Sequence, residues 1–172
     1  MSRISKRCFV AGTSLLAFTA LAWPVRINTT KSIPVGFYWI TSESVKKGSY
    51  VIFCPSETEL FDTAKERGYI GAGFCPGGYG YMMRRVVAVK GDAVAIGADG
   101  VRVNGELLPL SVPHIADKAG RPILRSETKR YTLGASELLL MSDVSGTSFD
   151  GRYFGPIDRK QIQGVIRPIL TW

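Results

Sequence analysis

The sequence predicts a mainly β, antiparallel domain with one small helical insertion, preceded by an N-terminal leader. Three observations support this fold class. Beyond Gly36 the chain consists mostly of short runs of aromatic and β-branched residues separated by turn residues. Only one segment has the amphipathic spacing of a helix, and it lies between two cysteines. The first residues join positive charges to a long apolar run.

Residues 1–25 form the leader, in which three positive charges precede an uncharged apolar run from Cys8 to Val25. A run of this length fits both a short membrane anchor and the apolar region of a secretory signal peptide. The small residues Ala20 and Ala22, on either side of Leu21, have the spacing that favours cleavage, whereas Trp23 and Arg26 are typical of the interface that ends a membrane span. Cleavage and retention both stay open. Either way, the leading positive charges predict that the rest of the chain crosses the membrane.

The domain that follows, residues 26–172, is long enough for one sizeable hydrophobic core but not for two full domains. The formal net charge of +8 at pH 7 is spread along the sequence, and several positive charges belong to the leader. Scattered charges predict a solvated basic surface and no nucleic-acid partner. Attraction to anionic lipid head groups stays open.

The domain contains eight runs with the composition of strands. Turn residues separate them, and Asn104-Gly105 is a strong hairpin signal because both positions tolerate the positive φ angles of a tight turn. No internal repeat is present in the sequence. Strands are therefore predicted at residues 37–41, 50–53, 81–89, 93–96, 101–103, 130–133, 138–141 and 162–170.

The one predicted helix lies in the insertion. Ser56 and Glu59 have the spacing of a capping box, and Gly68 supplies a stop at the other end. The apolar face of this helix consists of Leu60, Phe61 and Ala64. The segment from Gly71 to Gly80 holds five glycines and a proline. This composition predicts a flexible loop that closes the insertion.

Two of the three cysteines, Cys54 and Cys75, flank the insertion, and export beyond the membrane permits disulfides. We therefore expect a Cys54–Cys75 disulfide that closes an insertion of about residues 54–80. Cys8, in the leader, is expected to be an inert small hydrophobic residue. Without a CxxC pair, and with His114 as the single histidine, the sequence predicts no metal site and no cofactor. A Ser-His-Asp triad would also need His114, which lies in a proline-containing loop.

Three separated segments carry candidate chemistry. The first, Asn28 to Tyr38, places Ser32 before a proline and a glycine, a pattern that by itself is more typical of a turn than of a nucleophile. The second, Tyr81 to Asp92, ends in Gly-Asp, and the third, Ser142 to Gly155, contains Ser-Phe-Asp-Gly-Arg-Tyr. Their order and spacing are distinctive in combination.

In these segments the sequence resembles the type I signal peptidases, Ser/Lys-dyad enzymes of the bacterial inner membrane, and most of all their conjugative-transfer branch. The likeness extends along nearly the whole chain, including the Cys75-Pro76-Gly77-Gly78-Tyr79-Gly80 loop. It implies two antiparallel sheets, an apolar substrate groove that faces the membrane, and a periplasmic position at the outer face of the inner membrane. It also implies processing of a pilin precursor, with a cyclic pilin as the resulting form, and other conjugation proteins as partners.

The resemblance further implies roles for individual residues. Ser32 Oγ would attack a peptide carbonyl, while the Ser32 N–H and the Thr30 hydroxyl stabilise the oxyanion. A turn-forming role for Thr30 stays open. Ser148 would orient the dyad lysine. Asp150 and Arg152 would form an ion pair beneath the site, in a purely structural role or a direct catalytic one.

One position departs from the family pattern. The dyad lysine should lie eight residues before Asp92, where this chain has Arg84. Burial can lower the pKa of a lysine toward neutrality, but an arginine stays protonated and cannot accept the serine proton. Neither Lys31 nor Lys90 has the spacing to replace the lysine.

Three explanations for Arg84 stay open. It inactivates the chain, it permits slow turnover through the oxyanion site, or another base has been recruited. The first explanation leads to a second class of function, a catalytically silent, membrane-associated component that binds pilin or other transfer proteins without cutting them.

Overall fold

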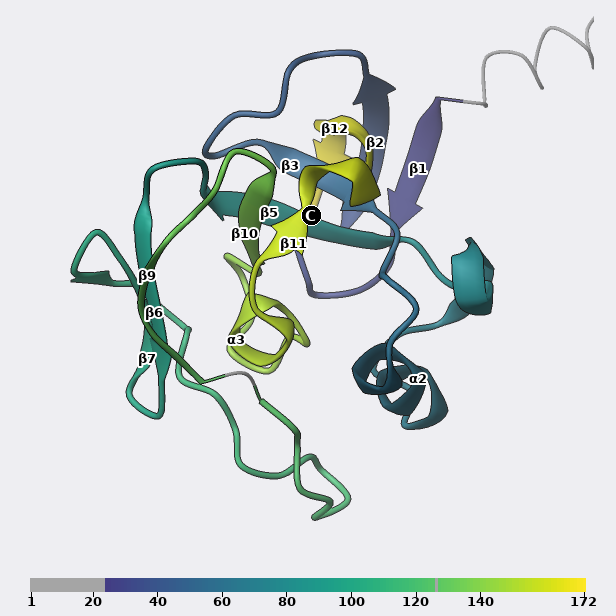
Figure 1. Cartoon of the computed structure of the whole chain (residues 1–172). Coiled ribbons are helices and arrows are strands. Elements are labelled where there is room, and N and C mark those ends of the chain that lie inside the picture. Colours follow the sequence, from purple (N-terminus) through teal and green to yellow (C-terminus); the bar gives the residue numbers. More distant parts are fainter. Residues whose placement is uncertain (1–23, 126) are drawn as a thin grey trace, which may run out of the picture.

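The computed structural model describes residues 24–125 and 127–172, so all but the last two positions of the predicted leader lie outside the described residues. Val25, the last of these positions, already belongs to a strand. The described chain forms two antiparallel sheets with a few short helices (Figure 1), which confirms the mainly β prediction. Within the described ranges no helix is long and apolar enough to cross a membrane.

The larger sheet has seven strands in the order β1-β2-β12-β3-β5-β10-β11, and the smaller one has four in the order β8-β7-β6-β9. The larger sheet consists of β1 (Val25–Asn28), β2 (Gly36–Thr41), β3 (Tyr50–Phe53), β5 (Met82–Ala88), β10 (Glu137–Met141), β11 (Ile157–Asp158) and β12 (Ile162–Thr171). The smaller sheet consists of β6 (Ala93–Gly97), β7 (Gly100–Val103), β8 (Glu106–Leu107) and β9 (Thr128–Thr132). The remaining elements are α2 (Glu59–Glu66), β4 (Ala72–Cys75), η1 (Pro76–Gly78), α3 (Gly151–Phe154) and η2 (Arg159–Gln161).

Each of the eight predicted strands is present, with ends shifted by at most two residues. The predicted hairpin turn is confirmed, because Asn104 and Gly105 adopt φ angles of 54° and 90° between β7 and β8. The strands that the prediction missed, β1, β4, β8 and β11, have four residues or fewer. Such short runs carry too little alternation to stand out in a sequence.

Strand β10 contributes side chains to two hydrophobic clusters, one for each sheet. Leu138 and Leu140 pack in the cluster under the larger sheet, whereas Leu139 and Met141 pack in the cluster of the smaller sheet. All four side chains are buried. Burial on both faces explains why this strand is an uninterrupted apolar run rather than an alternating one.

Helix α2 starts later than predicted. It begins at Glu59 with Thr58 as its N-cap, and no side chain caps it, so the predicted capping box between Ser56 and Glu59 is wrong. The Cys54 N–H donates to the Gln161 carbonyl at 3.0 Å and a proline follows, which keeps the chain extended past Ser56. The predicted stop is confirmed, since the chain turns at Gly68 with φ +75°. The predicted apolar face is confirmed as well: Phe61 and Ala64 are buried, and Leu60 packs beside them.

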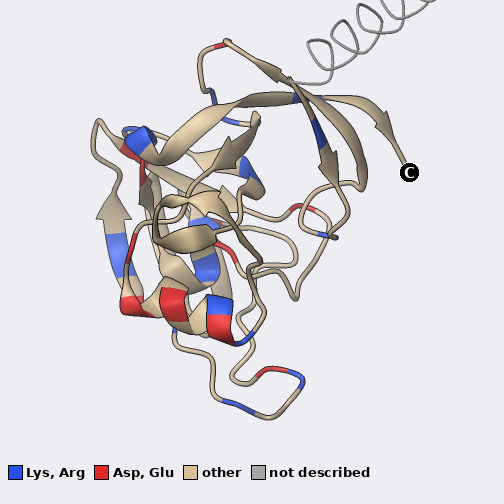
Figure 2. Ribbon diagram, turned by 90° about the vertical axis from the view of Figure 1, so that its right-hand side faces the viewer, with Lys and Arg blue, Asp and Glu red and all other residues tan. Residues whose placement is uncertain are grey.

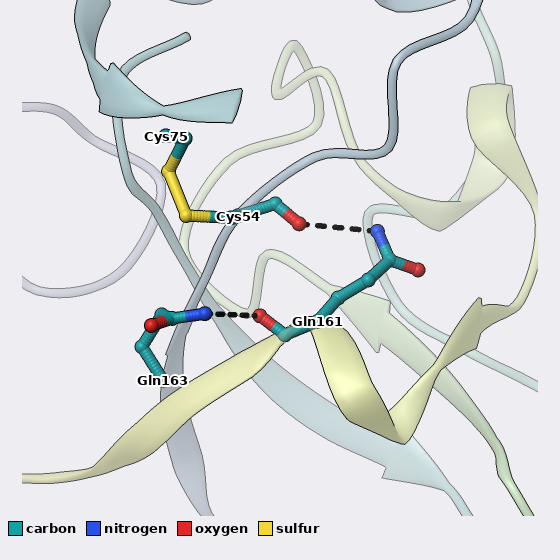
Figure 3. Close-up of a disulfide and its surroundings, with 4 residues drawn as sticks. All are labelled: Cys54, Cys75, Gln161 and Gln163. Atoms are coloured by element: carbon teal, nitrogen blue, oxygen red, sulfur yellow. Dashed lines mark hydrogen bonds between the residues drawn. A yellow bond between two sulfur atoms is a disulfide. The ribbon is translucent and has the colours of Figure 1, made fainter. Parts of the chain in front are cut away.

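The Cys54–Cys75 disulfide is present, as predicted, and ties the start of the insertion to β4. Figure 3 shows the Cys54 carbonyl accepting a hydrogen bond from Gln161 Nε2, at 3.1 Å. The segment 71–80 is more regular than the predicted loop, because it contains β4 and η1 and its ends are bridged by the Gly80 N–H donating to Gly71. Its Tyr79 is fully buried and donates to Asp62 at 2.6 Å.

Candidate active site

Ser32 lies in the turn between β1 and β2, and Asn28 at the end of β1 holds this turn together. The buried Asn28 amide donates from Nδ2 to three carbonyl oxygens, those of Thr30 (2.8 Å), Ile33 (2.9 Å) and Pro34 (3.1 Å). One side chain thereby satisfies the polar backbone on both sides of the serine.

The far end of the turn is fixed as well. The buried Tyr38 donates from its hydroxyl to the Pro34 carbonyl at 2.5 Å. Gly36 passes so close to β12 that a Cβ atom there would lie 2.1 Å from the Leu170 carbonyl oxygen, so only glycine fits. The turn around Ser32 is therefore preorganised from both ends.

The hydroxyl proton of Ser32 points toward Thr30. Thr30 Oγ1 donates to Asn28 Oδ1 at 3.0 Å, and Oδ1 is able only to accept, so Thr30 uses its single proton there. The 2.8 Å contact between Ser32 Oγ and Thr30 Oγ1 therefore has Ser32 as its donor. Thr30 would have to release Asn28 before its hydroxyl could donate to an oxyanion, so the oxyanion role stays a prediction.

Strand β5 buries the side chain of Arg84, because alternate residues of a strand share one face. Met82 and Val86, on the same face, are core residues, and Arg84 is only 5% exposed. Its guanidinium donates from Nη1 to the Met83 carbonyl at 2.7 Å and from Nη2 to the Phe149 carbonyl. Nε has no hydrogen-bond partner among the described residues.

The charge of Arg84 is only partly compensated. No ion pair in residues 24–125 and 127–172 includes it. Burial lowers the pKa of Arg84 to about 10; the negative charge of Asp150 opposes this shift and the positive charge of Arg152 adds to it. At pH 7 the guanidinium therefore stays protonated. Near neutrality Arg84 is a donor and a cation, not an efficient base.

The predicted ion pair between Asp150 and Arg152 is present and completely buried. Arg152 donates from Nε and Nη2 to the two Asp150 oxygens, each at 2.8 Å. Asp150 also caps α3 by accepting the Arg152 N–H, and it accepts the Ser142 N–H at 2.9 Å. Arg152 Nη1 donates to the Gly146 carbonyl at 2.6 Å. The pair thus ties β10, the following loop and α3 into one unit.

Ser148 lies beside the residue whose carbonyl binds Arg84. Its Oγ is buried and has no hydrogen-bond partner among the described residues. Arg84 Nε is the other buried polar atom of this site that lacks a described partner. Buried polar atoms without a partner are uncommon in folded proteins, and both of these belong to residues that line the same cavity.

A cavity of about 940 Å³ brings these segments together. Ser32, Thr30, Arg84 and Ser148 all line it, whereas the Asp150–Arg152 pair does not. Of the two lysines considered as replacements for the dyad lysine, Lys31 lines the cavity and Lys90 does not. Side chains from the β1–β2 turn, from β5 and from the segment before α3 thus line one concave surface, whereas the roles that the family resemblance implies for Ser32, Arg84 and Ser148 stay predictions.

Sequence reasoning missed two contributors. Asn28 was not singled out, although it organises the serine turn. His114 was set aside, yet it lines the same cavity as Ser32, and its backbone N–H donates to the Tyr153 hydroxyl at 3.0 Å. No sequence signal could have placed it there, because its position depends on how a long loop folds back over the domain. Among the described residues, no group of three or more His, Cys, Asp or Glu is arranged to hold a metal ion.

Comparisons with known proteins agree on one family. The family model for signal peptidase, peptidase S26, matches residues 2–172. Two Escherichia coli proteins named plasmid transfer protein TraF are 66% and 59% identical to this chain, over 100% and 99% of it and over 100% and 97% of their own lengths. A probable conjugal transfer protein TraF from Sinorhizobium fredii is 37% identical over 86% of this chain and 77% of its own.

A crystal structure of a signal peptidase I from Enterococcus faecalis covers 74% of this chain and 100% of its own, with a TM-score of 0.40 and 18% identity. The family match spans almost the entire sequence, and two relatives share more than half of their residues with it over their full or nearly full lengths. The chain therefore belongs to the signal peptidase family, peptidase S26, and groups within it with the plasmid transfer proteins TraF.

Proposed function

We propose that this chain binds the precursor of a conjugative pilin and processes it as a serine endopeptidase, with Ser32 as nucleophile and with Arg84 limiting the rate. It works at the outer face of the inner membrane, where the leader directs it, and the cyclic pilin is the final product. The observation that carries the proposal is that Ser32 and the position of the expected base line one cavity.

The edge of β5 offers a place for an extended polypeptide. β3 pairs with Met82 to Arg85 on one side of β5, whereas β10 pairs with the other side only at Arg85, Val86 and Ala88. The other edge of Met82–Arg84 has no strand partner in the described part of the chain, and these residues line the cavity. A substrate strand added there gains backbone hydrogen bonds and passes Ser32.

Cleavage proceeds by acyl transfer to Ser32. The serine oxygen forms a bond to the substrate carbonyl carbon, its proton passes to a base, and the peptide nitrogen leaves with a proton. Attack by water on the acyl-enzyme then releases a linear product, whereas attack by an amine of the same polypeptide releases a cyclic one. Both routes require a neutral base near Ser32, and Arg84 is almost always charged near pH 7.

That charge favours a second candidate function. A chain with a permanently protonated residue in place of the base would still bind the pilin precursor in the cavity without cutting it. It would then act as a membrane-associated binding component of the conjugation machinery.

The deciding experiment compares the native chain with Arg84→Lys on a pilin precursor, with mass spectrometry of the products. We expect slow cleavage by the native chain and a rate about 100-fold to 1,000-fold higher for Arg84→Lys, because a buried lysine titrates near neutrality. Mass spectrometry also separates linear from cyclic products, which differ by one water. Fast cleavage by the native chain that Arg84→Lys leaves unchanged would show that Arg84 does not occupy the position of the base.

Two further variants complete the experiment. Ser32→Ala is expected to abolish cleavage and retain binding; retained cleavage would exclude Ser32 as nucleophile. Binding without cleavage by both the native chain and Arg84→Lys would favour the second candidate. His114→Gln and Lys31→Gln test recruitment of another base, since both positions line the cavity. Only a recruited base would make either substitution as damaging as Ser32→Ala.

A further inference from the structure

The cavity around Ser32 is positively charged. Its lining includes five cationic side chains and a single carboxylate, that of Asp117. The cationic side chains belong to Lys31, Arg67, Arg84, Lys118 and Arg121. A concave surface with such an excess of one sign concentrates the field and attracts ligands of the opposite sign.

The single carboxylate is already engaged within the protein. Asp117 accepts hydrogen bonds from the Tyr69 hydroxyl at 2.6 Å, from Arg121 Nε at 2.7 Å and from the Ala119 and Arg121 N–H groups, both at 2.9 Å. The Tyr69 hydrogen bond in particular holds the pKa of Asp117 well below its usual range. Asp117 therefore stays ionised and compensates Arg121, not the other cationic residues.

Lys31, Arg67 and Lys118 form no ion pair in the described part of the chain. Lys31 adjoins the nucleophile on the β1–β2 turn, while Arg67 ends α2 and Lys118 lies in the loop 112–125. Figure 2 shows this loop at the bottom of the molecule, with blue and red positions near its tip. The loop is held in place because Arg67 Nη1 donates to the Pro122 carbonyl at 2.6 Å.

We infer that the polypeptide segment that enters this cavity carries acidic side chains, which pair with Lys31, Arg67 and Lys118 beside the scissile bond. The inference rests on the proposed function only in that the cavity receives a polypeptide. It names the substrate class: a chain with Asp or Glu next to the residues that approach Ser32. Selection by charge acts mainly through the rate of encounter and through rejection of basic segments.

A membrane surface is the other anionic partner that cationic residues attract, and the shape of the site argues against it. A bilayer is broad and contacts protruding side chains, whereas these cationic side chains line a cavity that also contains the nucleophile. A polypeptide strand can enter such a space and a lipid surface cannot.

Binding to Ser32→Ala protein tests the inference without any need for turnover. The probes are two synthetic peptides of equal length, built from Ala, Gly and Ser and labelled with the same uncharged dye. One contains two glutamates and the other has glutamines in their place. Fluorescence anisotropy at low salt should show binding of the glutamate peptide about tenfold tighter, and the difference should shrink at high salt.

Matched variants place the effect in the cavity. The Lys31 and Lys118 side chains make no hydrogen bond or ion pair with a described residue, so Lys31→Gln and Lys118→Gln change charge without removing a contact. Each should weaken binding of the glutamate peptide about threefold and leave the glutamine peptide unaffected. Lys160→Gln, an exposed position outside the cavity lining, is the control and should change neither.

Several results would overturn the inference. The first is equal binding of the two peptides. The second is a loss of glutamate-peptide affinity in Lys160→Gln as large as in Lys31→Gln and Lys118→Gln. The third is binding of phosphatidylglycerol vesicles that depends on Lys31 and Lys118, without any selection between the peptides. A chain that selects the glutamate peptide but cuts no precursor refutes the proposed cleavage and leaves the inference standing. A chain that cuts the precursor equally well after the acidic residues of the precursor are replaced by amides refutes the inference and leaves the proposed cleavage standing.

Discussion

Two buried arginines near the cavity differ in how their charges are compensated. Arg152 is completely buried, and its guanidinium forms two 2.8 Å hydrogen bonds to the Asp150 carboxylate and one 2.6 Å hydrogen bond to the Gly146 carbonyl. Arg84 is almost as deeply buried, yet it donates only to carbonyl oxygens, and its Nε has no described partner.

This difference in charge compensation bears on whether each arginine can act as a structural support. The free-energy cost of desolvating a buried arginine is offset when a carboxylate accepts two of its hydrogen bonds. Arg152 has such a partner and can therefore support the fold beneath the site. A buried arginine without one keeps a charge that is only partly compensated, and burial lowers its pKa. Burial at position 84 disfavours a protonated side chain, and arginine is the residue least able to lose its proton.

The largest effect is expected from breaking the compensated pair. Arg152→Met should lower the free energy of unfolding by about 3–5 kcal/mol, because it leaves the Asp150 carboxylate buried without its partner. Urea denaturation followed by circular dichroism measures the loss. Replacing both residues of the pair by apolar ones should recover part of it. A loss below about 1 kcal/mol in Arg152→Met would show that water or another group can compensate Asp150.

The pH dependence of cleavage should reveal the uncompensated arginine directly. Only the neutral guanidine accepts a proton, and the pKa of Arg84 lies at about 10. The kcat/KM of the native chain should therefore rise about tenfold per pH unit from pH 7 to 9. In Arg84→Lys it should level off at a lower pH. A profile that is flat from pH 7 to 9 in the native chain would point to another base, with His114 as the cavity-lining candidate.

The fold was largely predictable because its strands alternate or are continuously apolar. The burial of Met82 to Ala88 follows the two-residue period, but the sequence Met-Met-Arg-Arg-Val-Val has the same residue types on both faces and does not show that Arg84, rather than Arg85, faces the interior. The start of α2 was not predictable from the Ser56–Glu59 spacing, since the hydrogen bond from Cys54 to the distant Gln161 fixes the chain there. Local capping signals fail where a long-range contact decides the backbone.

The candidate site was predictable from family likeness for Ser32, Arg84 and Ser148 but not for its surroundings. Asn28 organises the serine turn through hydrogen bonds from its side chain to backbone carbonyls, and such bonds leave no periodic pattern in the sequence. The position of Lys118 in the cavity lining depends on the loop 112–125, which Tyr69 and Arg67, from a different part of the sequence, hold through hydrogen bonds. Such tertiary hydrogen bonds can be read only from the folded chain.

Ser148 provides a finer test of the same comparison. Its buried Oγ has no described partner beside Arg84, so Ser148→Ala in the native chain should leave the cleavage rate nearly unchanged. In an Arg84→Lys background the amine can donate to this oxygen, and Ser148→Ala should then cost about tenfold in kcat/KM. A double-mutant cycle measures the coupling. Equal effects in both backgrounds would mean that Ser148 acts independently of position 84.

The smallest effect is expected from removing the uncompensated charge itself. Arg84→Met deletes two hydrogen bonds to carbonyls, which lowers stability, and also deletes a buried cation, which raises it. These contributions oppose each other, so the free energy of unfolding should change by less than about 1 kcal/mol. Urea denaturation beside Arg152→Met gives the comparison directly, since both variants replace a buried arginine by the same side chain. If Arg84→Met proved as destabilising as Arg152→Met, the charge of Arg84 would be compensated in solution, and the carbonyl contacts would be structural supports rather than remnants of a catalytic position.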